Sequence, residues 1–153
     1  MVRYRRMFAM EPVCGDDRTA MTELTLPRAD DLHVHLRDGE PMKAVVPLVY
    51  AGGAGRCLVM PNTRPPVTTA AAAAAYRRRL AEIEPRLDFR MTLYLTAGTT
   101  PEEVRRAAQS GVAALKLYPR GVTTASSYGV SDVDALGAAR GAAEEAGLVL
   151  CVH

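Results

Sequence analysis

From Leu24 onward, segments typical of short buried strands alternate with segments typical of helices. The strand-like segments are short and apolar, as expected for strands that are covered on both faces. The helix-like segments begin at capping residues and end at glycines. The expected strands are 31–36, 56–60, 89–95, 112–117 and 148–152, and the expected helices are 41–51 (interrupted at Pro47), 69–84, one starting at Thr100-Pro101, and one capped by Ser131 and running to Gly147. This alternation predicts an α/β fold with a parallel sheet and helices packed outside it.

Two architectures have this order of elements, a (β/α)8 TIM-type barrel and an open doubly wound sheet. No G-x-G-x-x-G motif follows the first strand, which weakens the doubly wound alternative. Polar residues gather at the carboxyl ends of the expected strands, where barrel enzymes place their sites. We therefore favour the barrel, which normally needs about 250 residues. Residues 24–153 would supply its first five strands, as the N-terminal part of a truncated barrel, and residues 1–23 are expected to be a disordered extension.

The composition excludes several function classes. The 153 residues are 48% hydrophobic with a formal net charge of +2, which argues against a nucleic-acid-binding surface. No apolar run approaches the roughly 20 residues of a membrane span. Three widely spaced cysteines predict free thiols in a reducing compartment, so we expect a cytoplasmic protein. An organelle-targeting N-terminus is the alternative, because Arg3, Arg5 and Arg6 are present, but nearby acidic residues argue against it.

The first expected strand carries a His-x-His pair. Side chains alternate across a strand, so His33, His35 and Arg37 should share one face, and Leu32, Val34 and Leu36 the other. Two imidazoles on one face can hold one metal ion, and a guanidinium beside them can hold an anion. The alternative is that these histidines are ordinary structural residues.

Lys116 lies in an apolar run that should be buried, and His153 follows the last expected strand. An ammonium group that points into a barrel is costly to desolvate, so its pKa should fall. A neutral lysine amine can react with carbon dioxide to give a carbamate, whose two oxygens can bridge two metal ions. The alternative is a lysine that snorkels to solvent or pairs with an acid.

Two further segments are candidates for substrate contacts. Asn62 follows the second expected strand and would anchor a substrate carboxylate together with Arg37, although a turn residue is the simpler interpretation. The hydroxyl-rich loop 121–127, with Thr123 and Thr124, could close over a site or could merely be exposed.

Four blocks of this sequence resemble dihydroorotases, members of the amidohydrolase superfamily, and most closely their compact monofunctional type. The blocks follow the order of that family from residue 30 to residue 153. They are Asp30-Asp31-Leu32-His33-Val34-His35-Leu36-Arg37-Asp38-Gly39, Met60-Pro61-Asn62-Thr63 with Pro65-Pro66, Lys116-Leu117-Tyr118-Pro119 with Thr123-Thr124 and Gly129-Val130, and Leu150-Cys151-Val152-His153.

The resemblance implies a role for each matching position. His33 and His35 would bind the more buried of two zinc ions, His153 would bind the second, and a carboxylated Lys116 would bridge them. Arg37 and Asn62 would hold the substrate carboxylate, and Thr123 and Thr124 would lie on a mobile loop. The implied reaction is the reversible conversion of N-carbamoyl-L-aspartate to L-dihydroorotate in de novo pyrimidine synthesis, by a homodimer that acts on a small-molecule substrate.

The sequence also departs from the family. The resemblance requires another histidine for the second zinc and a catalytic aspartate from a late strand, and neither is present in these 153 residues. We therefore expect this chain alone to be inactive and poorly soluble. The alternatives are a related cyclic amidohydrolase, such as a hydantoinase or allantoinase, and a non-catalytic amidohydrolase-like binding protein.

Overall fold

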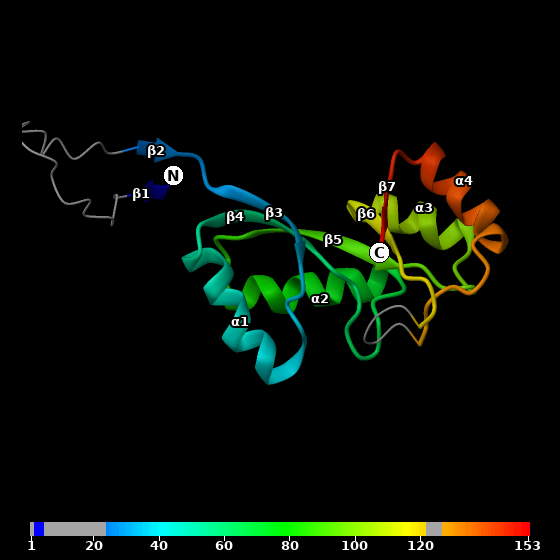
Figure 1. The fold of residues 1–153 in the computed structure, drawn as a ribbon, viewed down its shortest axis with the longest axis horizontal. Coiled ribbons are helices and arrows are strands. Elements are labelled where there is room, and N and C mark those ends of the chain that lie inside the picture. The colour runs from blue at the N-terminus through cyan, green and yellow to red at the C-terminus, as the bar shows by residue number, and fades with distance from the viewer. Residues whose placement is uncertain (1, 5–23, 122–126) are drawn as a thin grey trace, which may run out of the picture.

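The computed structural model describes residues 2–4, 24–121 and 127–153. Five parallel strands form one sheet, and helices connect them (Figure 1). A separate antiparallel pair, β1 with β2, stands apart from this sheet. The elements are β1 (Val2–Tyr4), β2 (Leu24–Leu26), β3 (Ala29–Val34), α1 (Gly39–Ala51), β4 (Ala54–Val59), α2 (Ala70–Ile83), β5 (Asp88–Tyr94), α3 (Pro101–Gln109), β6 (Ala114–Leu117), a 3-10 turn (Asp134–Leu136), α4 (Gly137–Glu145) and β7 (Val149–Val152).

The strand order in the large sheet is β3-β4-β5-β6-β7, the same as the order along the chain. A doubly wound sheet would reverse its order at a switch point, whereas a barrel adds each strand beside the previous one. The structure is therefore a partial (β/α) barrel, as predicted from the sequence. Among the described residues, no helix is both long and apolar enough to cross a membrane.

One face of the sheet forms the core together with the helices. Every second side chain of β4 and β5 is buried against them, and α2 contributes Tyr76 and Leu80 at helical spacing. Each fully buried large apolar side chain stabilises the fold by about 1.5–3 kcal/mol. The strand residues of this cluster include Cys57, Val59, Phe89, Met91, Leu93, Leu115 and Leu117, and the helix residues include Val46, Val104, Ala107 and Ala139.

The opposite face carries charges near the amino ends of the strands. Arg56 on β4 pairs with Asp30 on β3 at 3.2 Å and with Asp88 on β5 at 3.3 Å. Arg90 on β5 also contacts Asp88, at 2.9 Å. Asp30, Arg56 and Asp88 are direct partners in the strand register, so their side chains lie side by side. We refer to these four residues as the charge ladder.

A side chain of α3 links that helix to the start of α2. Thr69 and Thr100 cap α2 and α3, each accepting a hydrogen bond from a backbone N–H of the first turn. Glu103 on α3 reaches across to α2, where its Oε1 accepts the N–H of Ala70 at 2.6 Å. A carboxylate is favourable at this helix end because the free N–H groups there carry partial positive charge.

Several expectations about the elements were wrong in detail. The first strand lies two residues earlier than expected, and Leu32, predicted to share the face of Val34 and Leu36, is 70% exposed. Pro47 does not interrupt α1, because the carbonyl freed by its missing N–H belongs to the exposed Lys43. Ser131 is not the cap of the last helix. Asp132 Oδ1 instead accepts the N–H groups of Asp134 and Ala135 in the 3-10 turn that precedes α4, and α4 itself begins at Gly137 without a side-chain cap.

The N-terminal region was expected to be a disordered extension over residues 1–23. Residues 2–4 form β1 and pair with Leu24–Leu26. Residues 1 and 5–23 lie outside the part of the chain that the structure describes.

Candidate metal centre

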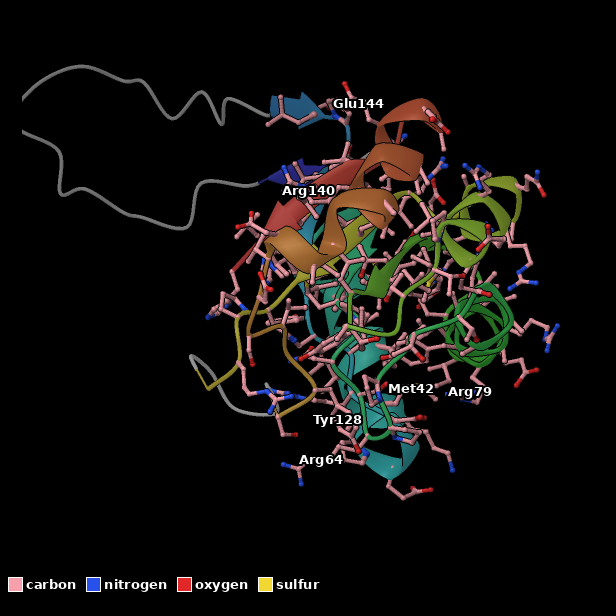
Figure 2. The ribbon with its side chains drawn as sticks, turned by 90° about the vertical axis from the view of Figure 1, so that its right-hand side faces the viewer. Met42, Arg64, Arg79, Tyr128, Arg140 and Glu144 are labelled. Carbon is pink, nitrogen blue, oxygen red and sulfur yellow. The ribbon has the colours of Figure 1, made fainter. Side chains whose placement is uncertain are left out.

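The candidate site lies at the carboxyl ends of the parallel strands. His33 is the fifth residue of β3, His35 follows that strand, Asn62 follows β4, and His153 follows β7. The loops after β4 and β6 extend from the same end of the molecule, where Figure 2 shows Arg64 and Tyr128. This is the end at which barrel enzymes build their active sites.

The two histidines of the His-x-His pair face each other. The Nε2 atoms of His33 and His35 are 3.2 Å apart, and the two ring centres are 5.1 Å apart. A tetrahedral zinc ion with Zn–N distances of about 2.0–2.1 Å holds two nitrogen ligands roughly 3.3 Å from each other. The pair therefore fits two ligand positions of one such ion.

Asn62 orients His35. Its Oδ1 lies 2.7 Å from His35 Nδ1, and because an amide oxygen only accepts, His35 Nδ1–H is the donor. The Nε2 atom of neutral His35 then carries the free lone pair that a metal needs, an arrangement typical of metal-binding histidines. The structure thus places Asn62 against His35, a contact that the sequence did not predict.

The protonated form of His33 is disfavoured. Burial lowers the pKa of His33 below its ordinary value, and the positive charges of Lys116 and His35 lower it further. A neutral imidazole at neutral pH has a lone pair available, whereas a protonated one must first lose its proton.

Lys116 lies on β6 and is only 2% exposed. No acidic side chain among the described residues pairs with its ammonium group. The Nζ atom instead lies 5.3 Å from the ring centre of Tyr118. Burial lowers the pKa of Lys116. Neither alternative for this residue holds, since the side chain does not snorkel to solvent and pairs with no acid that the structure describes.

His153 is placed by β6, because its backbone N–H donates to the carbonyl of Leu117 at 3.0 Å. Its ring lies 5.6 Å from the ring of Tyr118. Within residues 2–4, 24–121 and 127–153, no group of three or more His, Cys, Asp or Glu side chains is arranged to hold a metal ion. Of the predicted metal ligands, the structure brings His33 and His35 into close contact, whereas Lys116 lies on β6 and His153 follows the neighbouring strand β7.

The other predicted residues are placed less fully. Arg37 follows the end of β3 with a φ angle of 62°, so the alternation of the strand does not extend to it. Its carbonyl accepts a hydrogen bond from the Tyr76 hydroxyl, and its side chain is exposed. Thr123 and Thr124 lie outside the described residues.

No role was predicted for two tyrosines that lie beside Lys116. Tyr94 and Tyr118 are fully buried and stacked, with ring centres 4.8 Å apart, and neither hydroxyl has a hydrogen-bond partner in the part of the chain that the structure describes. The available signal was the spacing, because Tyr118 stands two residues after Lys116 on an apolar run. Cys57 and Cys151 are free thiols, and burial raises the pKa of Cys57 to about 12.

Sequence comparison finds dihydroorotases. The chain is 48% identical over 136 residues to a dihydroorotase of Vibrio atlanticus, a match that covers 87% of this chain and 40% of that protein. It is 53% identical over 135 residues to a dihydroorotase of Leptothrix cholodnii, covering 86% and 39%. The chain thus spans about 40% of the length of the curated relatives it matches. No protein-family model matches it.

Comparison with solved structures gives the same family. A dihydroorotase of Saccharomyces cerevisiae in complex with 5-fluoroorotic acid superposes with a TM-score of 0.80 at 36% identity, over 83% of this chain and 36% of that one. A Campylobacter jejuni dihydroorotase gives 0.74 at 29% identity, over 82% and 38%. An L-hydantoinase of Arthrobacter aurescens, at 21% identity and a TM-score of 0.69 over 83% and 29%, shares the fold. This chain is therefore related to the dihydroorotases over about 40% of their length, and its partial barrel is that of the amidohydrolases.

Proposed function

We propose that the protein carrying this chain is a dihydroorotase. It would interconvert L-dihydroorotate and N-carbamoyl-L-aspartate by opening and closing a cyclic amide, a step of de novo pyrimidine synthesis. The observation that carries the proposal is Lys116, a lysine buried without an acidic partner among the described residues, on the sheet that also holds the His33–His35 pair. The similarity to dihydroorotases over most of this chain supports the same activity.

Lys116 would act as a carbamate. The neutral amine attacks the carbon of carbon dioxide, an N–C bond forms, one C=O electron pair moves to oxygen, and the nitrogen loses a proton to solvent. Burial of Lys116 supports this step because it lowers the pKa of the amine and so raises the neutral fraction at neutral pH. The product carries one negative charge and two oxygens in place of a buried positive charge.

We propose that these residues contribute to a site for two zinc ions. His33 and His35 would hold one, His153 would hold the other, and the carboxylated Lys116 would contact both. Such ions polarise an amide carbonyl and lower the pKa of bound water toward about 7. Asn62 would keep His35 in its metal-binding tautomer, which the 2.7 Å contact supports.

Substrate binding would use the remaining predicted residues. Arg37 offers a guanidinium that no described residue occupies and that can bind a carboxylate with two hydrogen bonds. Asn62 and the loop hydroxyls of Thr123 and Thr124 would add neutral contacts. The protein would be a homodimer, as the resemblance implies, and cytoplasmic, as its three widely spaced cysteines indicate.

Zinc binding tests the centre directly. In a competition titration with a fluorescent chelator, His33→Ala or His35→Ala should weaken zinc affinity by more than about 100-fold, since loss of a supporting residue alone costs about 10–100-fold. Leu32→Ala, on the same strand and exposed, is the control and should leave the affinity unchanged. Equal zinc affinity for wild type and both histidine variants would rule out this centre.

Arg37→Ala tests the substrate. In the protein carrying this chain, the variant should raise KM for dihydroorotate about 10-fold or more, because a carboxylate loses a charged partner worth about 1.5–3 kcal/mol. Unchanged turnover by the variant would indicate a ring substrate without that carboxylate.

A polypeptide of these 153 residues alone has three histidines, His33, His35 and His153, and lacks the further histidine and the late-strand aspartate that the resemblance requires. We propose that this polypeptide is inactive, and robust ring opening by it would contradict this.

A further inference from the structure

Two tyrosines that flank Lys116 carry buried hydroxyl groups with no hydrogen-bond partner among the described residues. They are Tyr94 and Tyr118, which are 0% and 1% exposed, and their hydroxyl oxygens are the orphaned buried side-chain polar atoms among the described residues. Buried polar groups are nearly always paired, because an unmade hydrogen bond costs the desolvation of the group without any return. Two such groups in one place therefore indicate a missing acceptor.

The two tyrosines flank Lys116. Tyr94 on β5 is the direct partner of Lys116 on β6, so the two side chains leave the sheet on the same face. Tyr118 lies under the end of the lysine, whose Nζ is 5.3 Å from the ring centre. The two rings stack at 4.8 Å with an angle of 28°, which fixes both side chains.

The unmodified lysine does not satisfy these hydroxyls. An ammonium group is only a donor, so it offers no acceptor for the hydrogen of a tyrosine hydroxyl. A carbamate on the same nitrogen brings two anionic oxygens, which accept hydrogen bonds strongly. The acceptor that the hydroxyls lack is thus the group that Lys116 gains from carbon dioxide.

We propose that Tyr94 and Tyr118 are positioning residues whose hydroxyl groups donate to the carbamate of Lys116 and thereby favour its formation. The inference rests on the proposed function, because it requires that Lys116 be carboxylated. It adds a role for two residues that are not expected to bind metal or substrate.

The test measures carbamate formation. Wild-type protein with two equivalents of zinc is titrated with ¹³C-bicarbonate at fixed pH, and the carbamate is followed by ¹³C NMR. Tyr118→Phe and Tyr94→Phe should each raise the half-saturating bicarbonate concentration about tenfold, the loss expected for one hydrogen bond to a charged group. Tyr76→Phe is the matched control, because the Tyr76 hydroxyl already donates to the carbonyl of Arg37, and the bicarbonate dependence should not change.

Thermal unfolding in metal-free, carbon-dioxide-free buffer separates positioning from a structural role. Tyr118→Phe and Tyr94→Phe should unfold at the wild-type temperature or above, since they remove unpaired hydroxyls, whereas Tyr76→Phe should unfold at a lower temperature. Carbamate formation in both variants at wild-type bicarbonate concentrations would overturn the inference and leave the proposed function intact. A wild-type protein that forms no carbamate would overturn both.

Discussion

Lys116 is a buried charge that opposes folding. Its ammonium group is buried on β6, next to Tyr94 and Cys151 in the strand register, and no described carboxylate compensates its charge. Burial lowers its pKa because the charged form loses its hydration. A residue chosen only for stability would be apolar here, so the site retains a cost that the rest of the core must offset.

Replacement of this lysine should stabilise the protein. Lys116→Met in metal-free, carbon-dioxide-free buffer should raise the free energy of unfolding by about 1–4 kcal/mol, the range for replacing buried charges by apolar residues. The folded-state pKa of Lys116 is lowered, so the gain should be full below that pKa and vanish as the pH rises to 10.5, the ordinary value. Denaturant titrations across this pH range test it, and a variant less stable than wild type at neutral pH would contradict it.

A contact between two candidate site residues could be predicted only where the two residues lie close together in the sequence. His33 and His35 are two residues apart on one strand, and their approach follows from strand geometry alone. The contact between His35 and Asn62 joins residues 27 positions apart, through a loop whose path the sequence pattern does not fix. The pairing of Tyr94 with Lys116 likewise depends on the register of β5 against β6, which no local pattern in either strand specifies.

At the level of the elements, the order was predictable and some boundaries were not. Capping residues such as Thr69 and Thr100 mark the helix starts because the bonds they make are local. The predicted start of the last helix was wrong because a 3-10 turn (Asp134–Leu136), bonded to Asp132, comes before it, and α4 begins at Gly137 without a side-chain cap that the sequence could signal. The expected first strand extended too far because the left-handed backbone of Arg37 ends the alternation. A left-handed backbone is uncommon at a residue other than glycine, so the sequence does not predict it.

Glu103 links two elements through a single hydrogen bond, which makes the link testable. Glu103→Ala should lower the free energy of unfolding by about 1–2 kcal/mol, because the Ala70 N–H at the start of α2 loses its acceptor. Glu102→Ala removes the neighbouring carboxylate of the same helical turn, which is exposed and does not contact α2, and should therefore cost less stability than Glu103→Ala. Equal losses for the two variants in urea titrations would show that α2 does not depend on this contact.

At the scale of the whole molecule, the sheet ends in two strands with one neighbour each. Within the described chain, β3 pairs only with β4 and β7 only with β6. Leu32 on β3 and Val149 and Val152 on β7 are large apolar side chains that remain exposed. The open edge of the partial barrel accounts for the exposure of Leu32. Its face is apolar in the sequence, but no described element covers it.

These edges should drive self-association of a polypeptide of these 153 residues. Exposed apolar edge strands pair readily, and lysine on an edge prevents pairing. Leu32→Lys combined with Val152→Lys should therefore move the sedimentation profile toward the monomer. Leu48→Lys, which is equally exposed but lies on α1, should not. A wild-type polypeptide that sediments as a monomer at all concentrations would contradict the prediction.

The charge ladder of Asp30, Arg56, Asp88 and Arg90 bears on how this scaffold can change over time. Its members are partly exposed and lie near the amino ends of their strands, while the histidines and Asn62 lie at the carboxyl ends. Exposed ion pairs contribute only about 0–1 kcal/mol each. Substitutions in the charge ladder should therefore cost little stability, and they lie far from the candidate metal ligands. Evolution can thus change these four residues readily, and solubility or heat tolerance can be engineered there without altering a candidate metal ligand.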